Sequence, residues 1–166
     1  FLDGVIKQET LSSRTFIDEV KNELFIDDNK PFSAYKTIST ILNKTTSSLK
    51  IVDNYIEATS LDFFTGVNTK AEINIISMKL LPNVASFNIA LAKFVTEWRG
   101  TSLELKITNY FHDRYIMIDN SEVWHLGPSL NYLGKKPAMI SRIQDEEVAK
   151  HIISLFNAQW TTATPI

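Results

Sequence analysis

The sequence predicts an α/β domain built on a mixed β-sheet with helices on both of its faces. Segments with the period of a strand alternate with segments of helical period from residue 49 to residue 107, and a run of further strands follows. The alternation is typical of parallel strands, whereas the later run is typical of an antiparallel meander. With 166 residues, of which 44% are hydrophobic and 22% charged, the chain suffices for one globular domain.

The first 30 residues are predicted to form a helical arm or linker that leads into the domain. Ser13 is placed to cap a helix over residues 14–25, whose apolar stripe consists of Phe16, Ile17, Val20 and Leu24. The polar run 27–30 ends this pattern. The chain starts without an initiator Met or a signal-peptide pattern, so we expect it to be a fragment of a longer one. The domain is expected over residues 31–160, followed by a frayed tail at 161–166.

The first half of the domain is predicted to contain two helices and two strands. The first helix follows Pro31 with Ser33 as its N-cap, and its apolar face consists of Tyr35, Ile38, Ile41 and Leu42. Residues 49–56 are typical of a buried strand, residues 59–65 of a short helix and residues 71–78 of a second strand.

The second half is predicted to continue with a helix over 84–98 that ends at Gly100, and a strand over 103–107 with one solvent-exposed face. Two strands, 114–118 and 122–126, are joined by a turn at 119–121, and a further strand spans 138–143. A final helix has Asp145, Glu146 and Glu147 in its first turn, and its apolar face is predicted to consist of Val148, Ile152, Leu155 and Phe156. The chain has no internal repeat.

Composition narrows the classes of function. The net charge of −2 and the pI near 5.9 lower the expectation of a general duplex-DNA binder, which usually needs a basic surplus, but they leave room for a local basic patch. The absence of cysteine excludes disulfides, thiolate nucleophiles and zinc–thiolate sites, and it fits a reducing, cytoplasmic compartment. No apolar run approaches the ~18–20 residues that span a bilayer.

The segment 110–134 carries the residues best suited to chemistry. In a strand, residues two apart point to the same side, so His112 and Arg114 are predicted to face one pocket. Asp119 lies at the turn that closes this strand, and Ser129 and Asn131 follow the next strand. The set provides an imidazole nucleophile, a guanidinium for phosphate oxygens, and a carboxylate or amide that could orient the imidazole.

A structural interpretation stands beside this one, because a histidine next to Asp and Arg is more often part of an ion pair than a catalytic centre. His125 is either another strand histidine or, next to the same pocket, a substrate-binding group. His151 in the last helix receives little weight, and Trp124 is the one tryptophan near the pocket.

The pattern His112-x-Arg114-x4-Asp119, followed by Gly127-Pro-Ser129-Leu-Asn131, resembles the phospholipase D superfamily, in particular its bacterial members. Members of that family carry His-x-Lys-x4-Asp and a downstream Gly-Ser/Thr-x-Asn turn, and the resemblance covers roughly residues 31–157. It implies that His112 attacks phosphorus and forms a phosphohistidine, and that Arg114 replaces the lysine that binds phosphate. Asp119, Ser129 and Asn131 occupy the remaining positions, and the family needs neither metal nor cofactor.

The resemblance leaves two hypotheses open, because the family uses two copies of the motif and this chain has one. The first is a metal-independent phosphodiesterase of nuclease type, with one His112 from each subunit of a homodimer. A missing part of the same polypeptide could also supply the second copy. The second is a catalytically inactive module for a phosphate-bearing ligand, either nucleic acid or a lipid head group, with lipid the less expected. The change from lysine to Arg114 fits either hypothesis, and a purely structural domain with a vestigial pocket is the remaining alternative.

Overall fold

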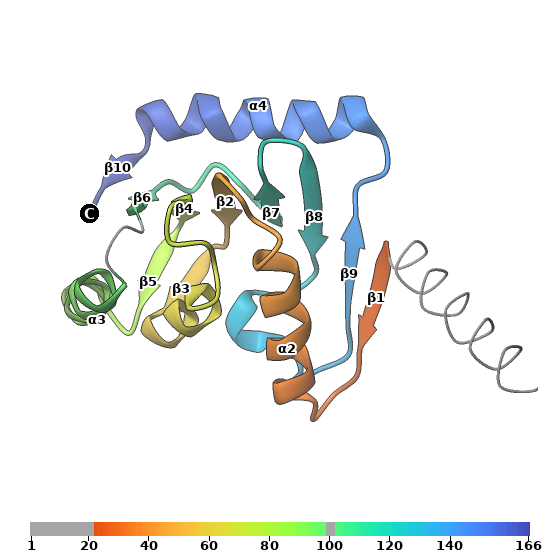
Figure 1. Cartoon of the computed structure of the whole chain (residues 1–166), viewed down its shortest axis with the longest axis horizontal. Coiled ribbons are helices and arrows are strands. Elements are labelled where there is room, and N and C mark those ends of the chain that lie inside the picture. Colours follow the sequence, from red (N-terminus) through yellow and green to blue (C-terminus); the bar gives the residue numbers. More distant parts are fainter. Residues whose placement is uncertain (1–21, 99–101) are drawn as a thin grey trace, which may run out of the picture.

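The computed structural model describes residues 22–98 and 102–166, and its centre is an eight-stranded mixed sheet (Figure 1). The strand order is β1-β9-β8-β7-β2-β4-β6-β10. These strands span Glu23–Ile26 (β1), Ser48–Val52 (β2), Glu72–Ser77 (β4), Ser102–Ile107 (β6), Arg114–Ile118 (β7), Glu122–Leu126 (β8), Ala138–Arg142 (β9) and Thr164–Pro165 (β10). Strand β2 pairs parallel with β4 and β4 with β6, whereas every other pair in this sheet is antiparallel.

Helices cover both faces of the sheet, which confirms the predicted fold class. One face carries α2 (Pro31–Leu42), the 3₁₀ helix η1 (Ala58–Phe64) and α3 (Val84–Glu97), and α4 (Glu146–Thr162) runs across the other face (Figure 1). A small second sheet pairs β3 (Tyr55–Glu57) with β5 (Lys79–Leu81), and a short 3₁₀ helix, η2 (Leu130–Tyr132), follows β8. Among the described residues, no helix is both long enough and apolar enough to cross a bilayer.

Alternation along the strands divides the core between the two faces. In β7, Ile116 and Ile118 pack into the larger core under α2 and α3, whereas Met117 packs against α4 with Phe156. A strand sends successive side chains to opposite faces, so Arg114, two residues before Ile116, belongs to the α2 face. Tyr115 belongs to the α4 face, where it packs against the second core.

The N-terminal prediction was wrong where the structure tests it. Residues 23–26 form β1, and Leu24 pairs with Ile140 of β9 in the main sheet instead of ending a helix. The rest of the predicted helix, with its cap Ser13, lies outside the described residues. A four-residue strand can gain hydrogen bonds along an existing sheet edge, and this tertiary pairing overrides the helical spacing of the apolar side chains.

Several element boundaries also differ from the prediction. The expected strand 49–56 is two strands, because the chain leaves the main sheet after Val52 and pairs with β5 from Tyr55. Helix α2 starts with Pro31 at its first position and Lys30 as its N-cap, so Ser33 is not the cap. The terminator assigned to Gly100 lies outside the described residues.

The C-terminal helix buries Phe156 as predicted, and Ile152 and Leu155 pack, partly buried, against the same core. Ala149, Ile153 and Phe156 are buried, whereas Val148 is 47% exposed. The expected frayed tail is also wrong: helix α4 continues to Thr162, and β10 then pairs with β6 at the sheet edge.

Candidate phosphate-binding site

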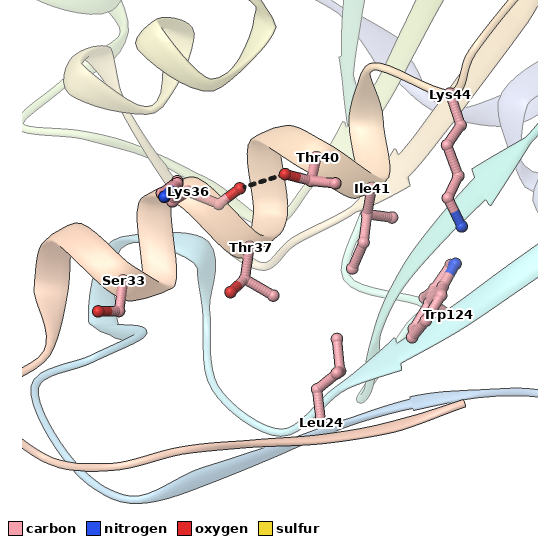
Figure 2. A pocket seen from close by; sticks show the side chains of 8 residues that line it. All are labelled: Leu24, Ser33, Lys36, Thr37, Thr40, Ile41, Lys44 and Trp124. Carbon is pink, nitrogen blue, oxygen red and sulfur yellow. Dashed lines mark hydrogen bonds between the residues drawn. The ribbon is translucent and has the colours of Figure 1, made fainter. Parts of the chain in front are cut away.

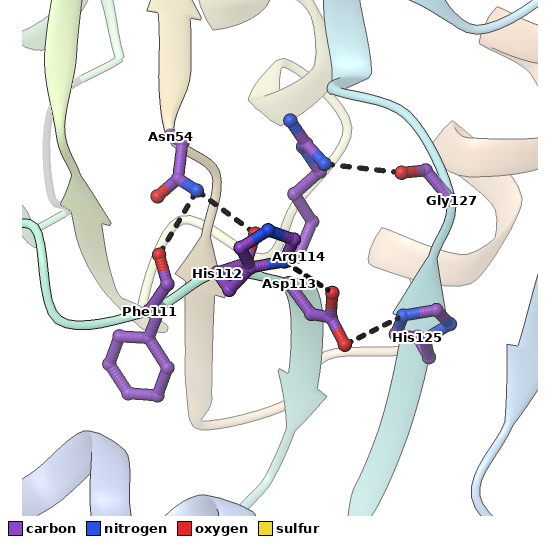
Figure 3. A network of polar contacts seen from close by, with 7 residues as sticks. All are labelled: Asn54, Phe111, His112, Asp113, Arg114, His125 and Gly127. Carbon is purple, nitrogen blue, oxygen red and sulfur yellow. Dashed lines mark hydrogen bonds and ion pairs between the residues drawn. The ribbon is translucent and has the colours of Figure 1, made fainter.

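The segment before β7 is anchored to the end of β2, at one rim of the main sheet. The side-chain amide of Asn54 donates hydrogen bonds of 3.1 Å to the carbonyl oxygens of Phe111 and His112 (Figure 3). Asn54 is buried and Phe111 packs into the core beneath α4. The backbone at His112 is therefore held by the fold, although its side chain is fully exposed.

Asp113 links two histidines at this rim. Its Oδ1 lies 3.3 Å from Nδ1 of His112, and its Oδ2 lies 3.5 Å from Nε2 of His125 on β8 (Figure 3). The hydrogen bond with His112 lowers the pKa of the Asp113 carboxyl and outweighs the opposing effect of partial burial, and attraction to His125 lowers it further. The carboxylate is therefore ionised at neutral pH and available to orient both rings.

Sequence reasoning missed Asp113, although the predicted hairpin contained the signal. In the register observed, Tyr115 lies opposite His125. Asp113 precedes Tyr115 by two residues, so it is the diagonal neighbour of His125 across the two strands, which is within reach of a hydrogen bond. The pairing of the strands, and not the spacing within either one, brings these groups together.

Arg114 is fixed by the turn that follows β8. Its Nη1 donates to the carbonyl oxygen of Gly127 at 3.2 Å, which sets the plane of the guanidinium (Figure 3). Its Nε is buried and has no partner, and Nη2 has none among the described residues. Nη2 therefore keeps its donors for an oxyanion.

The prediction that His112 and Arg114 face a single pocket is not confirmed. His112 lies in the bend before β7 and lines a hollow of about 190 Å³ together with Tyr115, Ile152 and Leu155, on the α4 side. Arg114 does not line that hollow and reaches toward Gly127 instead. The period-two argument failed because the strand begins at Arg114, so it does not extend to His112.

Asp119 lies at the opposite end of β7 from His112, and the five-residue strand between them is roughly 16 Å long at ~3.3 Å per residue. Its carboxylate accepts hydrogen bonds from the backbone N–H groups of Thr46, Ser47 and Ser48, at 2.8 to 3.2 Å, and from two of their hydroxyls. Partial burial raises the pKa of Asp119, but these hydrogen bonds outweigh it and lower the pKa from 3.8 to about 2. Asp119 thus lies at the turn after β7, as expected, where it ties the β7–β8 turn to the start of β2 and does not contact His112.

Ser129 is turned into the fold. Its hydroxyl donates to Oδ1 of the buried Asp53, whose Oδ2 accepts the backbone N–H of Leu130 at 2.7 Å. The N–H of Tyr55 donates to the same carboxylate at 3.1 Å. Asp53, at 1% exposure, was not singled out from the sequence, and it holds the turn after β8 against the end of β2.

Asn131 continues this internal network. Its Nδ2 donates to the carbonyl oxygen of Tyr55 at 2.7 Å, and its Oδ1 accepts the hydroxyl of Ser60 in η1. Of the three side chains expected to bind substrate, Ser129 and Asn131 are therefore engaged in holding loops together, and His125 contacts Asp113. Of the residues singled out from the sequence, His112, Arg114 and His125 lie at this rim.

The rim suits an anion better than a metal. Within residues 22–98 and 102–166, no group of three or more histidine, aspartate or glutamate side chains is arranged to hold a metal ion. The rim instead carries the guanidinium of Arg114, which can bind a phosphate by charge and hydrogen bonds.

Neither a protein-family model nor a curated protein matches the sequence, whereas solved structures match the fold. NucT from Helicobacter pylori superposes with a TM-score of 0.62 at 12% identity, over 87% of this chain and 98% of NucT. Nuc from Salmonella typhimurium, a phospholipase D family member, gives 0.59 at 13% identity, over 87% of this chain and 98% of Nuc. TrmBL2, an archaeal chromatin protein with a novel mode of DNA binding, gives 0.60 at 14% identity and covers 99% of this chain.

These matches define the class: the domain has the phospholipase D-like fold, as the sequence resemblance implied. The part of each structure that aligns with this chain is 98% of NucT and of Nuc, but only 65% of TrmBL2. At identities of 12–14% the likeness concerns the fold alone, so activity depends on the residues at the rim.

Proposed function

We propose that this domain binds a phosphate-bearing ligand at this rim of the sheet, with Arg114 as the anchor, and that it acts as a non-catalytic recognition or regulatory module. The observation that carries this proposal is the guanidinium of Arg114, which Gly127 holds in place while Nη2 keeps its donors for an oxyanion. A guanidinium fixed in this way loses little freedom when it binds phosphate, which favours affinity.

The surroundings of His112 support binding more than turnover. A nucleophilic imidazole needs the phosphate-binding cation beside it, yet Arg114 does not line the hollow that His112 lines and donates to Gly127 instead. Ser129 and Asn131, which the resemblance placed in the active site, are occupied by Asp53, Tyr55 and Ser60. The rim of one chain thus offers an anchor without a complete set of reacting groups.

The ligand class that we favour is nucleic acid or a nucleotide fragment of it. The domain shares its fold with NucT and with TrmBL2, whose structure shows a mode of DNA binding. The net charge of −2 predicts a short contact with few phosphates, so the affinity should depend only weakly on salt.

The test measures binding of a short single-stranded oligonucleotide and of vesicles with an anionic phospholipid, using Arg114→Ala and the matched control Arg142→Ala. Arg142 is also a partly exposed strand arginine, but it lies 3.8 Å from Glu122, away from the rim. Loss of a charge-assisted contact worth about 1.5–3 kcal/mol lowers affinity about tenfold or more in Arg114→Ala alone. Equal affinity in both variants contradicts the proposal. Binding to the vesicles but not to the oligonucleotide would mean that the ligand is a lipid head group.

A phosphodiesterase that works as a homodimer is the second candidate, and the contacts among His112, Asp113 and His125 favour it. A carboxylate that holds an imidazole at Nδ1 leaves Nε2 of His112 free to attack phosphorus, and the full exposure of this ring leaves room for a second copy. In that arrangement one His112 attacks and forms a phosphohistidine, while the partner's His112 protonates the leaving oxygen.

The two candidates differ in a simple assay with bis(4-nitrophenyl) phosphate in the presence of a chelator. The first predicts no release of nitrophenol by the wild type. The second predicts release that is lost in His112→Ala, a phosphohistidine trapped after an acid quench, and a dimer by sedimentation. Release by a strict monomer, or equal release by His112→Ala, contradicts the second candidate.

A further inference from the structure

A separate pocket of about 470 Å³ lies between α2 and the strands β1 and β8, away from the rim (Figure 2). One wall is a row of polar side chains from α2 and the residue after its cap: Ser33, Lys36, Thr37, Thr40 and Lys44. Leu24 of β1, Ile41 of α2 and Trp124 of β8 form the apolar part of the lining. The volume is within the range of about 300–1,000 Å³ that holds small molecules.

The spacing of the polar residues places them in one row. Within α2, Lys36, Thr37 and Thr40 follow Ser33 at three, four and seven positions, which is a single stripe along a helix, and Lys44 follows from the turn after its end. A helix that packs on a sheet normally turns apolar side chains toward it. Here the polar stripe lies next to the buried face of α2. Leu24 and Trp124 line the other side of the pocket (Figure 2).

The charge of the lining is positive. It contains Lys36 and Lys44 and no carboxylate; Lys36 lies in the middle of α2, and Lys44 lies in the turn that follows its C-cap Asn43. The carboxylate nearest to Lys44 is Glu122, at 3.4 Å. Glu122 also accepts a hydrogen bond from Nε1 of Trp124 at 2.6 Å and lies 3.8 Å from Arg142, so Lys44 shares this carboxylate with two other groups.

Hydroxyl groups lie between the two cations. Thr40 donates to the carbonyl oxygen of Lys36 at 2.8 Å within the helix (Figure 2). The hydroxyls of Ser33 and Thr37 have no hydrogen-bond partner in the part of the chain that the structure describes, and Thr37 is half-buried. A polar ligand could therefore exchange hydrogen bonds with this wall while its carbon skeleton covers Leu24 and Ile41.

We propose that this pocket binds a small, elongated organic anion with an acidic group at each end and hydroxyl groups between them. The two lysines bind the ends, the α2 hydroxyls bind the middle, and the apolar lining contacts the carbon chain. The proposal is independent of the rim, although Trp124 and His125 are neighbours on β8 and a ligand here contacts the strand that leads to the rim.

The test uses 6-phosphogluconate as the probe, with gluconate, sorbitol and inorganic phosphate as comparisons. Calorimetry gives the affinities, and the indole N–H resonance of Trp124, assigned with Trp124→Phe, reports the location. We expect saturable binding of 6-phosphogluconate, weaker binding of gluconate and phosphate, and none of sorbitol. Lys36→Glu and Lys44→Glu should each lower the affinity tenfold or more, and Thr37→Val a few fold.

Matched controls come from α3, where Lys93→Glu and Thr96→Val make the same changes on an exposed helix surface and should leave the affinity unchanged. Absence of saturable binding overturns the proposal. Binding that Arg114→Ala abolishes and Lys36→Glu leaves unchanged also overturns it, because the probe would then occupy the rim. If the proposal for the rim fails, the expected results for this pocket stay the same, because binding of the probe to the pocket does not require Arg114.

Discussion

Asp113 and His125 lie on neighbouring segments of the sheet rim, with 3.5 Å between the carboxylate Oδ2 and the imidazole Nε2. The same carboxylate contacts His112, so one negative charge sits between two groups that can gain protons. Whether this contact orients the histidines or repels an incoming anion can be measured directly.

Replacing Asp113 with Asn should strengthen binding of a singly charged phosphodiester such as dimethyl phosphate about two- to fivefold. Removal of a half-exposed like charge is worth about 0.5–1 kcal/mol in solvent, which corresponds to that ratio. Calorimetry at neutral pH checks the ratio, and Asp62→Asn, an exposed carboxylate on η1, is the control. Weaker binding in Asp113→Asn would mean instead that the carboxylate holds the histidines in place for the ligand.

Replacing Asp119 with Asn should lower the free energy of unfolding by roughly 1–2 kcal/mol at neutral pH and leave phosphate binding unchanged. Its pKa is lowered from 3.8 to about 2 on folding, and the shift is discounted for partial solvent screening. The unfolded chain binds the proton more readily, so wild-type stability from this group is complete above pH ~4 and is lost as the pH falls through about 2.

Urea unfolding at neutral pH and near pH ~2 measures both parts of this prediction, because the difference between wild type and Asp119→Asn should shrink in acid. Asp27→Asn, an exposed carboxylate before α2, provides the comparison. Loss of phosphate binding in a folded Asp119→Asn protein would contradict the structural assignment of this residue.

Replacing Asp53 with Asn should destabilise the domain by about 2–3 kcal/mol. The carboxylate is almost fully buried and accepts three hydrogen bonds, from Ser129, Leu130 and Tyr55. The side-chain amide of Asn has N–H groups in place of one carboxylate oxygen, so at least one of these donors would lose its acceptor. The urea midpoint gives the change, with Asp62→Asn again as a solvent-exposed comparison. An unchanged midpoint would show that the turn after β8 does not depend on this carboxylate.

Replacing Gly134 with Ala should cost about 1–3 kcal/mol of stability. Its φ of +79° is unfavourable for a residue with a Cβ, and that atom would lie 2.5 Å from the carbonyl oxygen of Lys30. Gly127→Ala is the matched control, because its Cβ would meet only the carbonyl oxygen of Met139, at 3.4 Å. Thermal unfolding distinguishes the two, and equal midpoints would contradict the argument.

Periodicity predicted the elements whose stability is local or whose faces are regular. The strands around Ile75 and Ile116 and the helix with Phe87 and Phe94 were expected close to where they are found. The strand β1 was missed because four residues around Leu24 gain their hydrogen bonds from β9, more than 110 positions later, and no local pattern encodes that pairing.

The site was predicted only in part, because contacts with distant segments of the chain are not encoded in local spacing. Spacing singled out His112, Arg114 and His125, and the structure links the two histidines through Asp113 and Arg114 to Gly127. It could not show that Ser129 faces Asp53 or that Asp119 faces Thr46, because those partners lie more than 70 positions away. A motif fixes the order of side chains along the chain, whereas hydrogen-bond partners from distant segments decide which of them stay free for a ligand.

The described chain enters the sheet at one edge, in β1, and leaves it at the other, in β10 (Figure 1). Seven gaps between the eight strands, at about 4.8 Å each, hold the two edges roughly 34 Å apart. Any module fused before β1 would therefore be held across the full width of the sheet from one fused after β10. The domain would act as a stiff spacer between them, and resonance energy transfer between labels on β1 and β10 would report its width.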